Sequence, residues 1–394
     1  MSAQDYKAPE SVGRTQMKGF AVGGVALLLT IVGAVTSSEK FYKAYLFSYL
    51  LVLGLTLGSL GLLMLQHLTG GLWGLAIRRP LEAASRNIWL MLVLFLPLLP
   101  GMNTLYSAWL SPQALAEHPL TAWQAGYLTR HGFYLRAVLY FVVWFALVFV
   151  FNRMSARQDA NPEDRALRRR LKMFAGPGVI LYVLTMTFAA IDWSMSLSPH
   201  WASTIYGFLF VAGQAITAMA WTIIAVVSLA KSEPYSAVLR PRRLHDLGKF
   251  LFAFNMLWAY FDFSQLLIIW SGNQPEEITF YMSRLHGQWG YVAVIVLVFS
   301  FALPFLVLLS QHVKRTPGLV SKVAAWMLVM RAVDLYWMTR PEFTSSALPD
   351  WRDIVTPIAL VGLWIGFFAM NLKQRPILPL GDPKLEEVLV HHEH

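Results

Sequence analysis

Asp262 stands in a long apolar run, within the stretch Ala259-Tyr-Phe-Asp-Phe-Ser-Gln265. On a helix, Gln265 shares its face three residues later, and Trp258 lies one turn before it. A carboxyl group in apolar surroundings is expected to be neutral or ion-paired, because burial disfavours its charged form. Such a group can relay protons or can form a structural hydrogen bond between helices. The sequence leaves both interpretations open.

Two more acidic residues lie near the ends of apolar segments. Arg331 and Asp334 are three residues apart, so they are expected to form an ion pair within one helix, as a structural staple or beside a proton path. Asp192 comes directly before Trp193 at the end of another segment. Its position near water suits a helix cap or a loop anchor, with proton transfer as the alternative.

Histidines occur near the ends of the apolar segments, with His67 and His312 at one side of the membrane and His131 and His286 at the other. Imidazole titrates near neutral pH, so His286 and His131 are candidates for proton transfer, with a purely interfacial role as the alternative. A haem held by two histidines needs imidazoles deeper in the membrane. On the side of the membrane where His67 and His312 lie, His67 and Glu82 are the titratable groups nearest to a possible proton entry.

The composition indicates that these groups sit in a lipid bilayer. The chain has 394 residues, of which 56% are hydrophobic and 14% charged, whereas soluble domains carry about 25% charged residues. There is no cysteine, which excludes disulfides, thiolate-bound iron–sulfur clusters and haem attached through cysteines. We therefore expect this chain to bind no cofactor, and we expect lipid rather than nucleic acid to meet its net charge of +10.

The expected fold is an all-α integral membrane protein, with residues 1–394 forming a single polytopic membrane domain. Spanning helices need about 20 mainly apolar residues. Ten segments meet this requirement: 20–36, 44–65, 88–110, 133–151, 174–197, 201–229, 250–270, 289–309, 323–338 and 354–372. The loops between them are too short for a soluble domain, and the longest are 66–87, 111–132 and 152–173.

Two local features modify this outline. Pro97, Pro100 and Asn103 are expected to break the third span. The basic run from Arg165 to Lys172 has helical spacing, and its expected role is contact with inner-leaflet phosphates, with a partner-protein site as the alternative.

The distribution of basic residues predicts the orientation. Of the 32 Lys and Arg residues, 24 fall on the side of the amino terminus and six on the opposite side, while Arg136 and Arg331 lie within spans. Cytoplasmic loops carry the excess of Lys and Arg. Both termini are therefore predicted to be cytoplasmic, with cytoplasmic segments at 1–19 and 373–394.

A faint internal repeat divides the spans. His131-Gly132 and His286-Gly287 open two spans that are four helices apart, and Asp192 and Asp334 lie in the spans that follow them. This spacing favours two parallel four-helix bundles, at 44–197 and 201–338, with the first and last helices peripheral. Chance similarity of short motifs is the alternative.

Several motifs together resemble one family, the ActF subunits of bacterial alternative complex III and their NrfD/PsrC-like relatives. The resemblance covers most of the chain. Its motifs are Ser48-Tyr-Leu, Leu65-Gln-His67-Leu-Thr-Gly-Gly-Leu-Trp73-Gly with Arg78-Arg79, Asp192-Trp-Ser-Met-Ser-Leu-Ser-Pro-His200-Trp-Ala-Ser-Thr-Ile-Tyr206-Gly, Phe263-Ser-Gln265, Ile269-Trp-Ser-Gly-Asn273-Gln-Pro275-Glu-Glu277 and Arg284-Leu-His286-Gly-Gln-Trp289.

The resemblance implies a ten-helix subunit of a quinol:electron-acceptor oxidoreductase in the bacterial plasma membrane. In such a complex, iron–sulfur and multihaem cytochrome subunits carry the electrons, the latter through haem c. A paralogous ActC-like membrane subunit is the one assigned the quinone site. The subunit that this chain resembles is expected to conduct protons or to act as a scaffold and to have no catalytic activity alone.

The alternative from another functional class is a secondary transporter with parallel repeats and with Asp262 as the coupling carboxylate. Short loops and the lack of paired broken helices disfavour it. Co-purification of haem and iron–sulfur subunits from native membranes distinguishes the two hypotheses.

Overall fold

A computed structural model of the chain describes residues 6–233, 235–382 and 384–385. The regular elements of these residues are helical, and no strand occurs among them. In chain order they are α1 (Glu10–Thr36), α2 (Ser38–Thr69), α3 (Trp73–Ser85), α4 (Ile88–Phe95), η2 (Leu96–Leu98), α5 (Met102–Leu105), α6 (Ser107–Leu110), α7 (Pro112–Glu117), α8 (Ala122–Tyr127), α9 (Arg130–Ala160), α10 (Arg165–Trp193), η3 (Met195–Leu197), α11 (Tyr206–Leu229), α12 (Tyr235–Val238), α13 (Pro241–Gly272), α14 (Pro275–Leu285), α15 (Gly287–Ile295), η4 (Val296–Ala302), α16 (Leu303–Leu309), α17 (Gln311–Arg315), α18 (Pro317–Thr339), η5 (Arg340–Glu342) and α19 (Trp351–Lys373).

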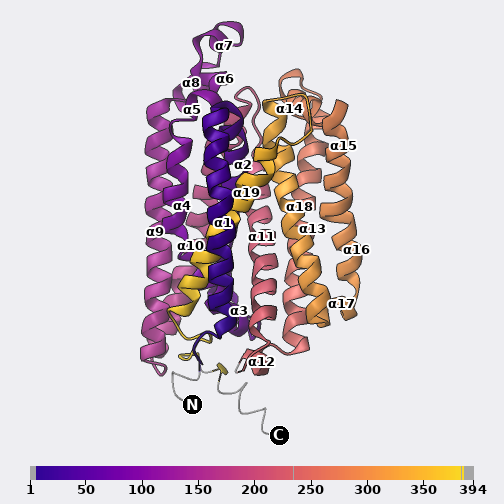
Figure 1. The fold of residues 1–394 in the computed structure, drawn as a ribbon. Coiled ribbons are helices and arrows are strands. Elements are labelled where there is room, and N and C mark those ends of the chain that lie inside the picture. Colours follow the sequence, from indigo (N-terminus) through magenta and orange to yellow (C-terminus); the bar gives the residue numbers. More distant parts are fainter. Residues whose placement is uncertain (1–5, 234, 383, 386–394) are drawn as a thin grey trace.

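Nine helical stretches of the described chain are long and apolar enough to cross a membrane. The ninth predicted segment, 323–338, lies in α18 and is helical as expected, but Lys322, Arg331 and Asp334 make this helix more polar than the others. α18 packs against α2, α11 and η4, so protein surrounds Arg331 and Asp334, whereas Lys322 is exposed. The chain is an all-helical, multi-pass membrane protein, as its composition predicts (Figure 1).

The predicted limits of the third span are wrong. The sequence suggested a loop at 66–87 and a span at 88–110, but the apolar helical stretch runs over Trp73–Leu98. Between Pro97 and the start of α9 the chain forms short helices only, because prolines remove backbone hydrogen bonds and interrupt a helix. The predicted break is confirmed, but it ends the span rather than kinking it.

α3 was mistaken for a loop because its charged residues resemble a surface segment. In the structure every residue of this helix is buried. The carboxylate of Glu82 lies 3.3 Å from Arg78 Nε and 2.5 Å from Arg79 Nη1. Asp382 also pairs with Arg78, and Asp159 with Arg79. Because these carboxylates balance the two arginines, the helix can be enclosed by protein despite its composition.

Pro80 lies inside α3 and leaves one carbonyl without its helical partner. A proline has no N–H, so the carbonyl four residues earlier, that of Ala76, receives no amide hydrogen bond. The hydroxyl of Tyr235 in α12 donates to this carbonyl instead. A residue far along the chain thus stabilises the proline-containing helix.

The predicted loop at 152–173 is also wrong, because two helices extend into it. α9 continues to Ala160 and α10 begins at Arg165, so residues 161–164 alone connect them. The carboxylate of Asp164 accepts a hydrogen bond from the backbone N–H of Leu167 and caps α10, as acidic N-cap residues commonly do. The helical spacing of the basic run is confirmed.

Small residues bring α1 and α19 together. Gly19 and Gly23 on α1 face Gly362 and Gly366 on α19, and a Cβ added at Gly23 would lie 2.5 Å from the backbone nitrogen of Leu363. This small-xxx-small spacing lets backbones approach closely in membranes, where helix association depends on packing. Only glycine fits at these crossing points.

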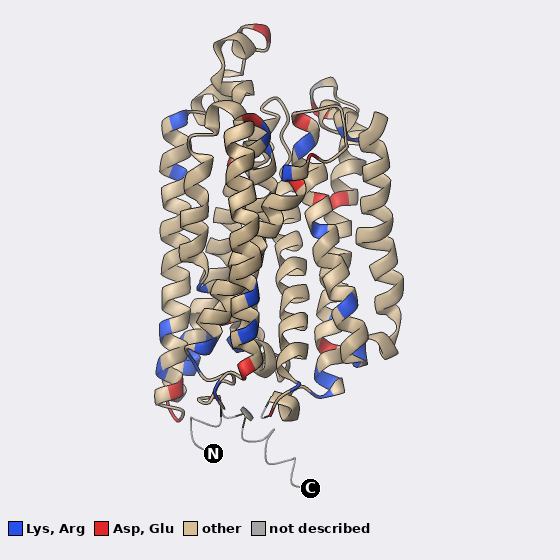
Figure 2. Ribbon diagram, in the orientation of Figure 1, with Lys and Arg blue, Asp and Glu red and all other residues tan. Residues whose placement is uncertain are grey.

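The described chain ends meet at one end of the molecule. The backbone N–H of Ile377 donates to the carbonyl of Tyr6 at 2.9 Å, just before α1 and just after α19. We call this end, where α1 begins and α19 ends, the basal end, and the opposite end the distal end. Figure 2 shows that Lys and Arg gather toward the basal end.

α2 forms the centre of the molecule and is buried along nearly all of its spanning length. It contacts α10, α11, α18 and α19. Figure 1 shows α9 and α10 on one side of it and α13, α15 and α18 on the other. The peripheral helices expose large apolar side chains such as Val25, Leu139 and Val294, which is the expected surface for contact with lipid.

Candidate functional site

The candidate site is built on one face of α13. The helix starts with Pro241 at its first position and ends before Asn273, which adopts the left-handed conformation that commonly terminates helices. Asn255, Trp258, Asp262 and Gln265 are spaced three or four residues apart and therefore share a face. Asn255, Trp258 and Gln265 are buried, whereas Asp262 is half-buried.

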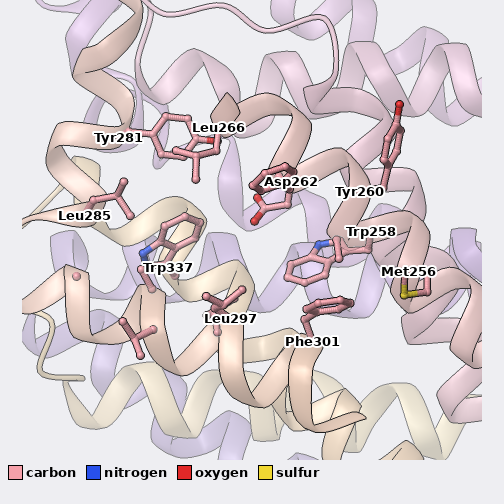
Figure 3. A pocket seen from close by; sticks show the side chains of 16 residues that line it. Met256, Trp258, Tyr260, Asp262, Leu266, Tyr281, Leu285, Leu297, Phe301 and Trp337 are labelled. Carbon is pink, nitrogen blue, oxygen red and sulfur yellow. The ribbon is translucent and has the colours of Figure 1, made fainter. Parts of the chain in front are cut away.

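Asp262 lines a cavity of about 710 Å³ between α13, α14, α15, η4 and α18. It carries the one carboxyl group among the residues that line this cavity. In Figure 3, Asp262 lies at the centre, with Trp258 on one side and Trp337 on the other. The aromatic residues of the wall are Trp258, Tyr260, Phe263, Tyr281, Phe301 and Trp337.

The carboxyl group of Asp262 has no bonded partner in the described part of the chain: it forms neither a hydrogen bond nor an ion pair there. A buried charge without a partner is costly, so such groups are rare in membrane helices. Gln265, which shares its face, is engaged elsewhere. Its Oε1 accepts from Ser203 Oγ at 2.9 Å, and its Nε2 donates to the hydroxyl of Tyr281 at 3.1 Å.

A second, smaller cavity adjoins the first at Trp258, which lines both. Its volume is about 20 Å³, enough for one water molecule. Three buried polar atoms around it have no hydrogen-bond partner: Oδ1 of Asn255, Nε1 of Trp258 and Oγ of Ser300. This polar cavity offers a water the two or more partners that it needs.

A π-helical turn shapes the wall of this polar cavity. In η4 each N–H bonds to the carbonyl five residues earlier, and the fifth residue after Phe299 is Pro304, which has no N–H. The indole N–H of Trp326 donates to the carbonyl of Phe299 instead, at 2.9 Å. Asn255 Nδ2 donates to the carbonyl of Phe301 at 3.3 Å. π-Helical turns are rare and often occur at functional sites.

Arg331 and Asp334 of α18 complete the polar cavity. Their side chains form the ion pair predicted from their spacing, and both are buried. Gly213 of α11 provides the space for the guanidinium, because a Cβ there would lie 2.3 Å from Arg331 Cζ. Asp262 and this ion pair therefore line two adjoining cavities that share Trp258.

The structure does not bring the other predicted distal residues to this site. Asp192 lies in α10 and is bound by Arg136 of α9, with Arg136 Nη2 2.8 Å and Nε 2.9 Å from its carboxylate oxygens. The hydroxyl of Tyr140 donates to the same carboxylate at 2.6 Å. His286 is exposed, and its Nδ1 lies 3.2 Å from the carbonyl of Met282. Neither Asp192 nor His286 lines either cavity.

The two residues predicted near a proton entry lie at the basal end. Glu82 forms ion pairs with Arg78, Arg79 and Arg375 and accepts a hydrogen bond from Ser155 Oγ at 2.5 Å. The ring of His67 stacks on Phe151, with the ring centroids 5.7 Å apart. These contacts make Glu82 a structural anchor, and its role as a proton entry remains a prediction.

Sequence reasoning did not include Asn255, Ser300 and Arg136 among the site residues. Asn255 could have been found, because it lies seven residues before Asp262 and therefore on the same face of one helix. Arg136 also gave a signal, since a charge within a span requires a partner and Asp192 ends the next span on the same side. Ser300 gave none, because its position depends on the π-helical turn.

No group of three or more His, Asp or Glu side chains converges within the described residues in a way that suits a metal ion. Known protein-family models and curated proteins were both compared with the chain, and neither comparison gives a match.

Proposed function

We propose that this chain is an ActF-like membrane subunit of a bacterial quinol:electron-acceptor oxidoreductase, alternative complex III, and that it contributes a proton path and a scaffold rather than a redox centre. The observation that supports the proton path best is the unpartnered carboxyl group of Asp262, which faces a large cavity and adjoins a polar cavity through Trp258. A structural carboxylate in a membrane helix would have a partner.

The proposed path passes through two carboxyl groups, those of Asp262 and Asp334. Asp262 holds a proton on its carboxyl group while it faces the apolar cavity, because the neutral form is favoured there. A water held by Asn255, Trp258 and Ser300 passes the proton between Asp262 and Asp334, whose charge Arg331 balances. When Asp334 takes up the proton, the net charge of the Arg331–Asp334 pair changes from zero to +1. It returns to zero when the proton leaves.

The proposal includes the remaining features of the family. Electrons pass through haem c and iron–sulfur clusters of partner subunits, and quinone is bound beside an ActC-like paralogue. The helices of 44–197 and 201–338 form the two parallel bundles. In the bacterial plasma membrane, the basal end, where α1 begins, α19 ends and Lys and Arg residues gather, faces the cytoplasm.

Orientation is tested by reporter fusions in the loops. A reporter placed after residue 120 or 280 is expected outside the cell, and one placed after residue 160 is expected inside. The reverse pattern would overturn the orientation and the direction of the proposed path, without affecting the assignment of Asp262 as its central group.

The proton path is tested with Asp262→Asn in the intact complex, reconstituted in proteoliposomes. This change keeps the size and polarity of the side chain and removes its titration. We expect normal assembly and quinol oxidation, with loss of the proton movement coupled to it. The matched control is Asp246→Asn on the same helix, where the carboxylate is exposed and pairs with Lys249. Unchanged coupling in Asp262→Asn, or no coupling in the wild type, would exclude the path.

The size of the Asp262 cavity favours a second candidate, a secondary transporter in which Asp262 is the coupling carboxylate. A proton path needs only a single row of water molecules, whereas the cavity volume of about 710 Å³ is typical of a small-molecule site. Purification from native membranes decides between the two. Haem and iron–sulfur subunits that co-purify in fixed ratio support the complex, whereas a chain purified without them and active in solute uptake supports the transporter.

A further inference from the structure

A second large cavity lies at the basal end, far along the chain from the Asp262 site. It has a volume of about 640 Å³ and lies between α4, α9 and the segment that follows α19. Three arginines line it: Arg86, Arg153 and Arg375. The remaining lining residues are mostly apolar: Ile88, Trp89, Phe145, Ala146, Val148, Phe149, Asn152 and Ala156.

The positive charge of the three arginines exceeds the negative charge that nearby carboxylates supply to them. Among the described residues, Arg86 and Arg153 form no ion pair with a carboxylate. Arg86 donates to the side chain of Gln374 and to the carbonyl of Asn371, while its Nε is buried without a partner. Arg375 lies 3.5 Å from Glu82, and the Arg78 and Arg79 that also contact Glu82 pair with Asp382 and Asp159 as well, so the charge left without a carboxylate is that of Arg86 and Arg153.

The apolar wall extends from the arginines toward the middle of the membrane. Phe149 lies one helical turn before Arg153 on α9, and Phe145 lies one turn before that, so the wall continues for about 12 Å along this helix. Trp89 lies three residues after Arg86 and packs against Phe145, with the ring centroids 4.3 Å apart. Trp89 and Phe149 are mostly exposed.

We propose that this basal cavity binds one anionic phospholipid, with the phosphate held by Arg86, Arg153 and Arg375 and the acyl chains lying along Phe145 and Phe149. Arginine binds phosphate oxygens in a two-pronged geometry, and basic pockets between spanning helices are suited to anionic headgroups. The occupant is a lipid rather than a soluble anion because the cavity is continuous with an exposed apolar wall at membrane depth. The bound lipid joins α4, α9 and the segment after α19.

The test measures which lipid the purified full chain retains. The chain is equilibrated in detergent micelles with equal amounts of phosphatidylglycerol and phosphatidylcholine, and the bound lipid is counted by native mass spectrometry. We expect one tightly held phosphatidylglycerol. The variant Arg86→Gln/Arg153→Gln should lose affinity for it by about fivefold for each arginine. The control Arg242→Gln/Arg315→Gln removes the same charge from exposed basal positions of α13 and α17 and should retain the lipid.

A second variant keeps the experiment decisive if the arginine variant does not fold. Ala146→Trp fills the apolar part of the cavity and leaves the charges in place, so it should also release the lipid. Retention of phosphatidylglycerol in both cavity variants, or equal retention of phosphatidylcholine by the wild type, would overturn the proposal. So would displacement of the lipid by inorganic phosphate alone, because it would identify a site for free anions.

Discussion

Asp192 and Asp262 are both aspartates on apolar helices in the distal half of the molecule, but their surroundings are opposite. The carboxylate of Asp192 is buried and bonded to Arg136 and Tyr140 of the neighbouring helix, at distances of 2.6–3.1 Å. Asp262 faces a cavity and has no bonded partner among the described residues. The residue type is the same, and the difference comes from the helix packed opposite.

The comparison separates a structural carboxylate from one that is free to exchange protons. A fully bonded carboxylate fixes the geometry of two helices, because moving it would break its four hydrogen bonds to Arg136 and Tyr140. An unpartnered carboxyl group fixes nothing, and its protonation can change without loss of a contact. On this basis Asp192 anchors α10 to α9, and Asp262 is the group suited to proton transfer.

The largest effect is expected from removal of the partner of Asp192. Arg136→Gln leaves a buried carboxylate without its cation, which typically costs about 3–5 kcal/mol. The free energy of unfolding of the chain in mixed micelles should fall by this amount. Arg157→Gln, on the same helix at an exposed position, serves as the control and should change it little. A small effect of Arg136→Gln would mean that Asp192 is not an anchor.

The two aspartates themselves should respond differently to the same substitution. Asp192→Asn weakens hydrogen bonds to a charged group and should lower the free energy of unfolding by about 2 kcal/mol. Asp262→Asn removes no contact, so the change should stay within about 0.5 kcal/mol. Thermal unfolding followed by tryptophan fluorescence measures both. Equal destabilisation by the two variants would contradict the distinction between them.

The Arg331–Asp334 pair depends on a glycine of another helix, and this dependence can be measured. Gly213→Ala places a methyl group where the guanidinium of Arg331 lies, which should cost about 2 kcal/mol through overpacking. The same substitution at Gly176 meets open space and should be neutral or slightly stabilising. If both variants unfold alike, Gly213 does not position the ion pair.

The smallest effect on stability is expected at the polar cavity. Ser300→Ala removes a hydroxyl that has no bonded partner, so the free energy of unfolding should change by about 0.5 kcal/mol or less. If a water bridges the cavity, the rate of proton uptake in proteoliposomes should still fall, although less than in Asp262→Asn. An unchanged rate would remove Ser300 from the proposed path.

Much of this architecture follows from the order of apolar and charged residues. Long apolar segments predict spanning helices because backbone groups in lipid must bond within their own segment. The i, i+3 spacing of Arg331 and Asp334 predicts their ion pair, which the structure confirms. The limits of α3 could not be predicted, because burial of Arg78, Arg79 and Glu82 depends on charges that neutralise one another within a folded protein.

In the candidate site, too, one part is evident from the sequence and another part is decided by tertiary contacts. Asp262 is evident from sequence, since a carboxyl group in an apolar helix is a candidate for function wherever it occurs. Contacts between helices decide three further features: Asp262 has no bonded partner, polar atoms of Asn255 and Ser300 line the adjoining cavity, and Arg136 binds Asp192. Local periodicity specifies which residues share a helix face, but only tertiary packing determines what that face meets, because in a membrane helices associate through close fit rather than through hydrophobicity.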